Sequence, residues 1–558
     1  MPRPHSPHPY DGAVTSTPSP AIVGNPPAAA RFQTLGRHPS GSALPSIAER
    51  LVPPMPGAGA RGRLVGWLVP ILIAAFAGFV RFYHLGRPHS FVFDEIYYPK
   101  DAQAMLHHGV EFDWVANADV KILAGANPVP LMTTPSFVVH PPLGKWFFAV
   151  SEWLFGMTPF GWRFVVALMG TLSVLMIGRI VRRLTRSDVL GAFAALLLAV
   201  DGLHLVMSRT GLLDLQLMFW IMAGVGALLI DRDWSRTRLA AAIDPVTGRL
   251  PIGSRGPRML VRPWRIAAGL AFGAATATKW NGVYVLAAFA LLSVVWDYGA
   301  RRMVGTRRLE LTWLRWDAIP AFLSTAVVTF AVYLASWTGW LVTGDGYDRQ
   351  WSFQNPAGGL TGHVPDALRS LWHYHAEMIH FHTTLTADHP YKANAWSWLI
   401  LGRPTAFYSD YPAKQPCDAK ECVATVVALG TPLLWWAACI AIVVALVVWI
   451  GARDWRFGVP VVGVAAAWLP WFPFGHRPIF YFYAIAILPF LVIALALAAG
   501  LLIGPPGAAP RRRLAGVVVV AAFTVAVVVN FAYFYPIYTA EVVSRAQWAA
   551  TMWFNRWI

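Results

Sequence analysis

Long apolar segments alternate with short polar ones from about residue 64 to the end of the chain. A helix needs roughly 20 residues to cross about 30 Å of hydrocarbon, and fewer where neighbouring helices shield it from lipid. The pattern therefore predicts an all-α polytopic membrane protein with about 11 transmembrane helices. The predicted crossings, with bounds good to several residues, are 64–81, 161–181, 189–207, 212–230, 265–278, 280–297, 317–341, 425–450, 458–473, 479–503 and 514–535.

The composition agrees with this pattern. Of the 558 residues 56% are apolar and 13% are charged, and 27 Trp and 32 Phe are present. A soluble protein carries nearer to a quarter charged residues, which excludes a soluble enzyme as well as a disordered protein. Residues 1–60 differ, because they are rich in Pro, Ala, Gly and Ser. We expect them to form a disordered cytosolic tail before a membrane domain at 61–558.

The distribution of charge predicts the orientation of the chain in the membrane. With the N-terminus in the cytosol, the segments expected inside carry 27 of the 45 Lys and Arg residues. The loops expected outside, 82–160, 201–214 and 342–424, hold about a dozen cations but 17 of the 28 acids. Topology therefore accounts for the net charge of +17, and nucleic-acid binding loses its support. Two of the extracytoplasmic loops, 82–160 and 342–424, are long.

Two adjacent carboxylates, Asp94 and Glu95, follow the first apolar segment and are flanked by aromatic residues. Partial desolvation beside a membrane raises the proton affinity of a carboxylate, which suits a general base. An isolated acidic pair is more often a solvated turn, because acids usually lie in water. The pair is a candidate for catalysis, and the residues around it decide whether this interpretation is favoured over a solvated turn.

Several cations are predicted on the same side as these acids. The motif His140-Pro-Pro-Leu-Gly-Lys145 has two prolines that fix an extended turn, which could also be a rigid entry into an interfacial helix. Any single cation at the end of an apolar segment could be a snorkelling anchor. Together with the two acids they could hold a phosphate group beside a base. The cations at the outer ends of apolar segments are Arg163, Arg209, Lys279 and Arg477.

The second long loop is rich in histidine, but it lacks the His-Glu-x-x-His order of a catalytic zinc site. We therefore expect no metal and a polar, aromatic helix lying over the membrane surface. In the same loop Cys417 and Cys422 lie close together in an oxidising compartment, so a disulfide bond is plausible. The histidines and the acid among them are His373, His375, Glu377, His380, His382 and His389.

In this order the motifs resemble the protein O-mannosyltransferase family, in particular its bacterial polyprenyl-phosphate-mannose branch. The resemblance runs from about residue 65 to the C-terminus and implies a GT-C fold. The second loop, about 80 residues long, is too short for the β-trefoil domain that eukaryotic relatives insert there. The resemblance rests on Asp94-Glu95, His140 to Lys145, Arg163, Arg209, Thr278-Lys279-Trp280 and the histidine-rich loop.

The resemblance implies an inverting glycosyltransferase of the plasma membrane with its active site on the extracytoplasmic face. It would move mannose from polyprenyl-phosphate-mannose to Ser or Thr hydroxyls of secreted or membrane proteins, without a cofactor. Expected partners are membrane lipid and a translocation channel that delivers the polypeptide. The implied roles are a general base at Asp94, an orienting acid at Glu95, phosphate-binding cations at Arg163, Lys279, Arg209 and Arg477, and a loop shaped by His140 and Lys145.

Two other functions fit parts of the pattern. A related GT-C enzyme could transfer a lipid-linked sugar to a glycolipid, and the motif at residues 140–145 favours a protein acceptor only moderately. A transporter is less well supported, because few ionisable residues lie in the middle of the apolar segments, where a transport path would need them. No internal repeat is visible either.

Overall fold

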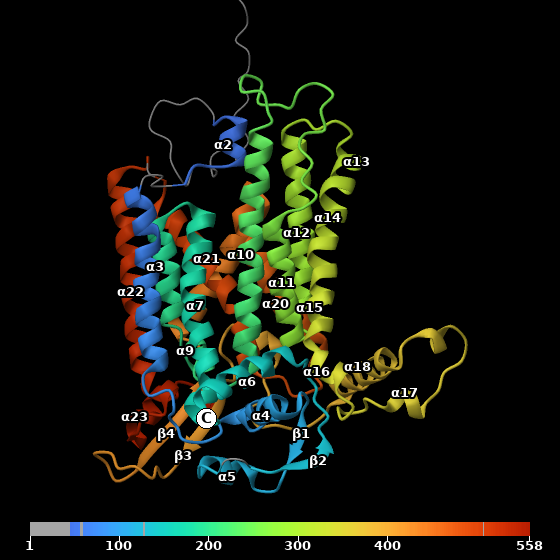
Figure 1. Ribbon diagram of the computed structural model, residues 1–558. Coiled ribbons are helices and arrows are strands. Elements are labelled where there is room, and N and C mark those ends of the chain that lie inside the picture. The colour runs from blue at the N-terminus through green and yellow to red at the C-terminus, as the bar shows by residue number, and fades with distance from the viewer. Residues whose placement is uncertain (1–44, 56–59, 127–128, 506) are drawn as a thin grey trace, which may run out of the picture.

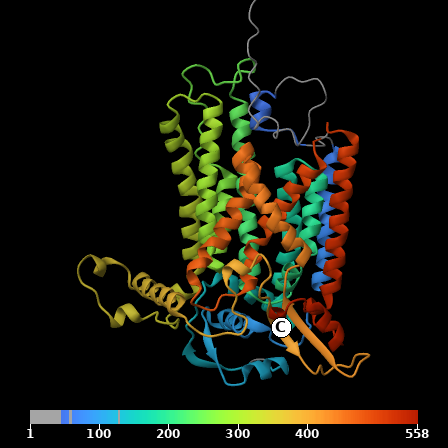
Figure 2. The same ribbon diagram turned by 180° about the vertical axis from the view of Figure 1, so that it is seen from behind.

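The computed structural model describes residues 45–55, 60–126, 129–505 and 507–558, and it is a bundle of long helices with smaller elements gathered at one end (Figures 1 and 2). Within these residues, eight helical runs are long and apolar enough to cross a membrane. They are α3 (Ala60–Phe82), α7 (Pro159–Thr185), α10 (Leu213–Ala240), α12 (Gly282–Met303), the run Leu309–Ser336, α19 (Pro432–Ala452), the run Trp455–Phe474 and α22 (Pro510–Thr539). The run Leu309–Ser336 contains α13 (Leu309–Trp313), α14 (Ile319–Phe322) and α15 (Val328–Ser336), and the run Trp455–Phe474 begins with α20 (Trp455–Trp468).

Each of the eleven predicted segments contains a helix, but three of these helices are shorter than a full crossing. They are α8 (Asp188–Ala199), α11 (Pro263–Thr278) and α21 (Leu488–Ile503). The count of eleven membrane crossings therefore stays a prediction. Short helices of this kind cross a bilayer only where neighbouring protein shields their ends.

Some of the predicted segments do not fold as one continuous helix. The segment 189–207 is broken, because the side chain of Asp201 accepts a hydrogen bond from the His204 amide at 2.9 Å and starts a new helix, α9 (Gly202–Met207). The segment 425–450 begins as a strand, β4 (Cys422–Ala428), before α19 starts. A short apolar run does not by itself distinguish a buried strand from a helix.

The first and second long loops lie at the same end of the bundle, which we call the loop end (Figure 1). Two small antiparallel sheets, β1–β2 and β3–β4–β5, are part of this end, so the fold is mostly rather than entirely helical. The first loop contains η1 (Phe93–Ile96), α4 (Tyr98–His108), β1 (Phe112–Trp114), α5 (Ala118–Leu123), β2 (Leu131–Pro135) and α6 (Leu143–Phe155). The second loop and the C-terminus contain α16 (Thr338–Val342), α17 (Trp351–Gln354), η4 (Gly359–His363), α18 (Asp366–Thr384), η5 (Ala395–Ser397), β3 (Thr405–Asp410), β5 (Val543–Ser544) and α23 (Arg545–Thr551).

Part of the expected disordered tail is folded. Residues 47–51 form α2 (Ile47–Leu51), which Ser46 and Glu49 cap through reciprocal hydrogen bonds. Leu51 is fully buried against Leu239 and neighbouring apolar side chains of α10 and α12. Composition suggested disorder because this segment has no core of its own, but it packs against the core of the membrane domain. The other expected tail residues, 1–44 and 56–59, lie outside the described residues.

The half of the bundle away from the loop end holds a buried network of ion pairs. Arg262 donates to Asp231 at 2.9 Å and to Asp297 at 2.8 Å, and Arg265 donates to Asp297 at 2.6 Å. These residues come from α10, α12 and the start of α11, and all are nearly inaccessible to solvent. Such a network joins the three helices, because every charge in it has a partner.

Candidate active site

The two adjacent acids of the first loop have different environments. Glu95 is fully buried and accepts two hydrogen bonds from Arg163, both at 2.8 Å. It also accepts hydrogen bonds from the backbone amides of Gly211 at 2.7 Å and Val92 at 2.9 Å. Both carboxylate oxygens are thus fully engaged. The prediction that Glu95 orients the sugar or the acceptor is not supported, since this side chain instead holds η1 and thereby positions Asp94.

Arg163 also belongs to this structural contact. Besides Glu95, its guanidinium donates to the carbonyls of Leu85 at 3.3 Å, Pro88 at 3.0 Å and Ser90 at 2.8 Å. These bonds use all five N–H groups of the guanidinium, and the residue is 0% exposed. The predicted role in binding phosphate therefore does not fit the geometry, because Arg163 has no donor left to offer.

Arg209 likewise faces protein groups. It donates to the carbonyls of Val80, Arg81, Tyr83 and His84, at 2.7 to 3.3 Å, where helix α3 ends. A cation at this position satisfies carbonyls that have no partner within the helix. Arg209 thus caps α3 and does not reach toward Asp94, contrary to the prediction that it binds phosphate.

Lys145 is the fourth predicted site residue with a structural environment. It is buried, forms an ion pair with Glu111 and lies 3.9 Å from a carboxylate oxygen of Asp101. Its position in the first turn of α6 joins that helix to α4 and to the start of β1. The expectation that Lys145 shapes the first loop agrees with these contacts.

Asp94, unlike Glu95, has a carboxylate that is available to accept a proton. No side chain or backbone group among the residues that the structure describes donates a hydrogen bond to its carboxylate. Burial raises the pKa of Asp94 to about 7, the positive charge of Lys279 partly opposes this, and the negative charge of Asp214 adds to it. A carboxylate with such a pKa is a much stronger base than one in water, while a large fraction of it is still ionised near neutral pH.

Lys279 connects this acid to a cavity. Its ammonium donates to Asp214 at 2.8 Å and lies 4.3 Å from the centre of the Tyr483 ring. Asp214 begins helix α10, and Lys279 lies where helix α11 ends. Tyr98 is also close to Asp94. Burial and the negative charge of Asp94 raise the pKa of the Tyr98 hydroxyl well above its usual value. Its hydroxyl therefore stays protonated and can donate a hydrogen bond.

The cavity beside Lys279 has a volume of about 220 Å³. It brings together three of the predicted residues, His140, Lys279 and Arg477, with His382 from the second loop. The guanidinium of Arg477 donates to the His382 ring at 3.2 Å and to its carbonyl at 3.1 Å. Within the part of the chain that the structure describes, the buried Nε of Arg477 has no hydrogen-bond partner. A cavity with two cations and an unused N–H donor fits an anionic group such as a phosphate.

The histidines around this cavity are neutral. His382 donates from Nε2 to the Val139 carbonyl at 2.8 Å, so its Nδ1 accepts from Arg477. Burial lowers the pKa of His382 to about 4, and burial together with nearby cations lowers that of His140 well below its usual value. The two rings stack with centroids 5.5 Å apart. They therefore add shape and hydrogen bonds to the cavity, and the positive charge comes from Lys279 and Arg477.

An aromatic cluster holds the backbone next to Asp94. Phe93 has a φ angle of 52°, a left-handed conformation that costs energy for a residue with a large side chain. Its ring stacks on Phe407 at 4.8 Å and meets Phe480 and Phe482 edge to face at 5.5 and 5.4 Å. This packing stabilises the strained conformation, and with Glu95 it fixes the direction in which Asp94 points.

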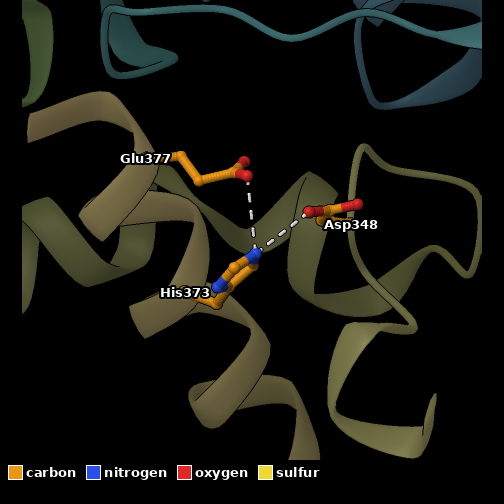
Figure 3. A group of neighbouring side chains, drawn as sticks. All are labelled: Asp348, His373 and Glu377. Carbon is orange, nitrogen blue, oxygen red and sulfur yellow. Dashed lines mark ion pairs between the residues drawn. The ribbon is translucent and has the colours of Figure 1, made fainter. Parts of the chain in front are cut away.

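One group of side chains in the second loop could hold a metal ion, although none was expected. Figure 3 shows the Nε2 atom of His373 facing two carboxylates, Asp348 at 3.3 Å and Glu377 at 3.5 Å. One nitrogen and two oxygen donors could bind a divalent cation such as zinc. None of the three lines the cavity beside Lys279. A cation bound there would fix α18 to the preceding loop and would not contact a substrate in that cavity.

A larger cavity lies elsewhere in the loop end. Its volume is about 1250 Å³, and residues of both long loops line it, among them Gln103, Met132, Arg349 and Trp351. Neither Asp94 nor Lys279 borders it. Size alone is therefore a poor guide to the site here, and the chemistry of the lining residues identifies the smaller cavity instead.

In the same loop end Cys417 and Cys422 form a disulfide bond, as predicted.

Sequence reasoning did not identify three contributors to the site. Asp214 was visible only as one acid in a turn, and Tyr98 and Tyr483 as two of many aromatic residues. All three become significant through their closeness to Asp94 and Lys279. The position of Asp214 in the first turn of a membrane helix is the one signal that could have found it, since an acid buried there needs a cationic partner.

Two family models match the chain. Residues 71–238 match the model described as dolichyl-phosphate-mannose-protein mannosyltransferase. Residues 367–557 match the model described as the C-terminal four-transmembrane region of protein O-mannosyltransferase. The first match contains the predicted base, and the second contains Arg477 and His382.

Curated relatives and solved structures agree with these matches. The chain is 37% identical over 527 residues to the polyprenol-phosphate-mannose–protein mannosyltransferase of Mycobacterium tuberculosis, covering 93% of this chain and 97% of the relative. It is 34% identical to the protein of the same name from Corynebacterium glutamicum, covering 87% and 92%. The fold is similar to that of the Saccharomyces cerevisiae protein O-mannosyltransferase Pmt1–Pmt2 complex bound to the sugar donor, with a TM-score of 0.69, 16% identity, and coverage of 88% of this chain and 92% of that one. The expected GT-C membrane fold is confirmed.

Proposed function

The chain belongs to the dolichyl-phosphate-mannose-protein mannosyltransferase family, and we propose that it transfers mannose from polyprenyl-phosphate-mannose to Ser or Thr hydroxyls of polypeptides. It is a multi-pass membrane glycosyltransferase. One observation carries the assignment of the site. The carboxylate of Asp94, which has no hydrogen-bond partner among the described residues, lies beside Lys279, and Lys279 lines a cationic cavity together with Arg477.

The geometry supports a division of labour between base and cations. An aliphatic hydroxyl is too weak a nucleophile unless its proton leaves as it attacks. In this mechanism Asp94 takes the proton while the hydroxyl oxygen forms a bond to the anomeric carbon of mannose. The bond from that carbon to the phosphate oxygen breaks, and the lipid phosphate leaves with the electron pair. Attack opposite to the leaving phosphate inverts the configuration at the anomeric carbon.

The leaving phosphate gains negative charge in this step. Lys279 and the unused Nε donor of Arg477 are placed to neutralise that charge in the cavity of about 220 Å³. Fixed donors of this kind stabilise a transition state strongly, because they need no reorganisation as the charge develops. His140 and His382 hold the cavity in shape and remain neutral.

We assign no metal or cofactor to the chemistry. The positive charge that a metal would supply to a phosphate is already provided by Lys279 and Arg477. The residues best placed to hold a cation, Asp348, His373 and Glu377, do not border the cavity. A cation there would act on the position of α18 alone.

We place the loop end outside the plasma membrane and the N-terminus in the cytosol. The excess of Lys and Arg in the segments at the other end supports this orientation. The disulfide bond between Cys417 and Cys422 in the loop end also supports it, because such bonds persist in oxidising compartments. In this orientation the active site would meet polypeptides that leave a translocation channel.

The experiment that tests the proposal compares two aspartate variants of the full-length protein in lipid nanodiscs. Asp94→Asn removes the base with almost no change of shape, and Asp113→Asn removes an acid elsewhere in the first loop. With labelled polyprenyl-phosphate-mannose and a Thr-containing peptide, we expect Asp94→Asn to lose about a thousandfold in rate while Asp113→Asn keeps full activity. Near-normal activity of folded Asp94→Asn would disprove the role of the base. Mannose on added glycolipid but not on peptide would disprove the acceptor.

A further inference from the structure

A second cavity, of about 340 Å³, lies at the end of the bundle opposite to the candidate active site, where α2, the end of α7 and the start of α20 meet α10 and α12 (Figure 1). Two acids, Glu49 and Asp454, line it. The positive charge of the lining is three times as large, because six arginines contribute to it. They are Arg50, Arg186, Arg232, Arg236, Arg453 and Arg456.

Nearby acids neutralise only some of these arginines. Arg456 donates to Asp454, and Arg186 donates to Asp233 at 2.9 Å. Asp233 also accepts from Arg183 at 2.6 Å and lies 3.8 Å from Arg232, so three arginines share this carboxylate. Positive charge therefore remains on the cavity wall.

Arg232 is the most unusual of these side chains. It is 4% exposed, yet its Nε and Nη1 atoms are buried and have no hydrogen-bond partner among the residues that the structure describes. The nearest carboxylate oxygen, on Asp233, is 3.8 Å from Nη1, which is too far for a hydrogen bond. The guanidinium stacks 3.3 Å above the Trp455 ring, which holds it at the cavity wall. Burying a cation with unused donors is costly, and an anionic ligand would remove that cost.

We propose that this cavity binds the phosphate group of an anionic ligand. The lining also contains apolar side chains, Leu184, Val295 and Met303, and it lies at the end of a membrane bundle. Basic pockets between transmembrane helices on the cytoplasmic side are suited to anionic lipid headgroups. A phospholipid headgroup and a free phosphate offer the same chemistry, and the experiment below distinguishes them.

Binding there would act on stability and not on the transfer reaction. A phosphate held by Arg232, Arg50 and Arg453 would join α10, the N-terminal helix α2 and the end of α19. The loop end, which contains the candidate active site, is the other end of the bundle (Figure 2). We therefore expect the ligand to raise the melting temperature of the protein without being required for turnover.

The test uses the full-length protein and charge-matched double variants. The double variant Arg50→Gln and Arg453→Gln removes two arginines that line the cavity. Both side chains are exposed, so we expect this variant to fold. Arg302→Gln with Arg307→Gln removes two exposed arginines that lie outside it. Arg232→Met, a third variant, removes the buried cation. Each protein is reconstituted in nanodiscs of phosphatidylcholine with 20% phosphatidylglycerol, and native mass spectrometry counts the retained phosphatidylglycerol.

We expect wild type and the Arg302/Arg307 control to retain phosphatidylglycerol. The Arg50/Arg453 variant should bind it about twentyfold more weakly, because each basic side chain near an anionic surface contributes roughly a factor of five to the affinity. A parallel arm measures melting in pure phosphatidylcholine with inorganic phosphate or with chloride at equal ionic strength. Stabilisation by phosphate in wild type, lost in the Arg50/Arg453 variant, would identify a soluble phosphate as the ligand. Equal retention and equal melting of the Arg50/Arg453 variant and its control in both arms would overturn the proposal.

Discussion

Two buried clusters of charge differ in how completely their charges are paired. In the network of Arg262, Asp231 and Asp297, carboxylates and guanidinium groups meet at 2.6 to 2.9 Å. At the loop end, Asp94 accepts no hydrogen bond from the described residues, and the Nε of Arg477 has no partner. The difference teaches that burial of charge alone does not mark an active site. A complete set of partners indicates a structural role, and an incomplete one indicates a place for a ligand.

The same distinction separates neighbours within the loop end. Asp94 and Glu95 are adjacent in the chain, but Glu95 has four hydrogen bonds and Asp94 has none. Arg163 and Arg209 are cations of the kind expected to bind phosphate, yet carbonyls and Glu95 use their donors. Substitution can test this comparison directly.

The largest effect is expected in the fully paired network. Arg262→Met leaves Asp231 and Asp297 with fewer partners, and breaking a buried pair costs about 3–5 kcal/mol. We expect the free energy of unfolding to fall by this amount and activity to fall only as folded protein is lost. Thermal unfolding in nanodiscs, beside activity per folded molecule, measures both. An unchanged free energy of unfolding would contradict the structural role that we assign to the fully paired network.

The next largest effect is expected at the incompletely paired cation. Arg477→Met removes a donor that we assign to the leaving phosphate, so kcat/KM should fall about a hundredfold while the melting temperature stays within a few degrees. Steady-state kinetics with the lipid donor measure the first quantity. As a control, Arg556→Met removes an exposed arginine of the same end. A large loss of stability with unchanged turnover per folded molecule would assign Arg477 to the structural group.

A smaller effect is expected from pH. Because burial raises the pKa of Asp94 to about 7, the basic form is lost as pH falls below that value. The rate kcat/KM should then drop about tenfold per pH unit below 7 and level off above it. Lys279 opposes this shift, so Lys279→Met should move the midpoint to higher pH. A midpoint near pH 4 would mean that the carboxylate is solvated.

The smallest effect is expected at the possible metal ligands. His373→Gln, and treatment of wild type with a chelator, should change turnover by less than about twofold, because the group does not border the cavity. His380→Gln on the same helix is the matched control. A loss of activity that zinc restores in wild type but not in His373→Gln would show that the cation matters for transfer.

Much of the architecture could be predicted from the chain, and the reason is physical. Apolar runs long enough for a bilayer leave few other structures, so a helix lies in each predicted segment. The break at Asp201 and the strand at Cys422–Ala428 were missed, because a helix cap and a sheet partner depend on residues far away in the sequence. The α2 helix was missed for the same reason, since its core belongs to other helices.

The candidate site was predicted in part. His140, Lys279 and Arg477 line one cavity, and the charge of Lys279 acts on Asp94, which does not line that cavity. Three others, Glu95, Arg163 and Arg209, have the charge that a site residue needs and lie at the loop end. They have structural environments instead, because a side chain's free donors depend on which carbonyls and carboxylates surround it. The contribution of Asp214 was hidden for the same reason.

The sequence by itself determined that this is a membrane protein with acids and cations at the end where its two long loops gather, since hydrophobic length and charge distribution are properties of the chain. Only the tertiary structure decided which charges are available for chemistry. Pairing is a matter of distances of about 3 Å between groups that lie tens to hundreds of residues apart, as between Lys279 and Asp214 or Arg477 and His382. No local pattern contains those distances, and they separate a catalytic carboxylate from its structural neighbour.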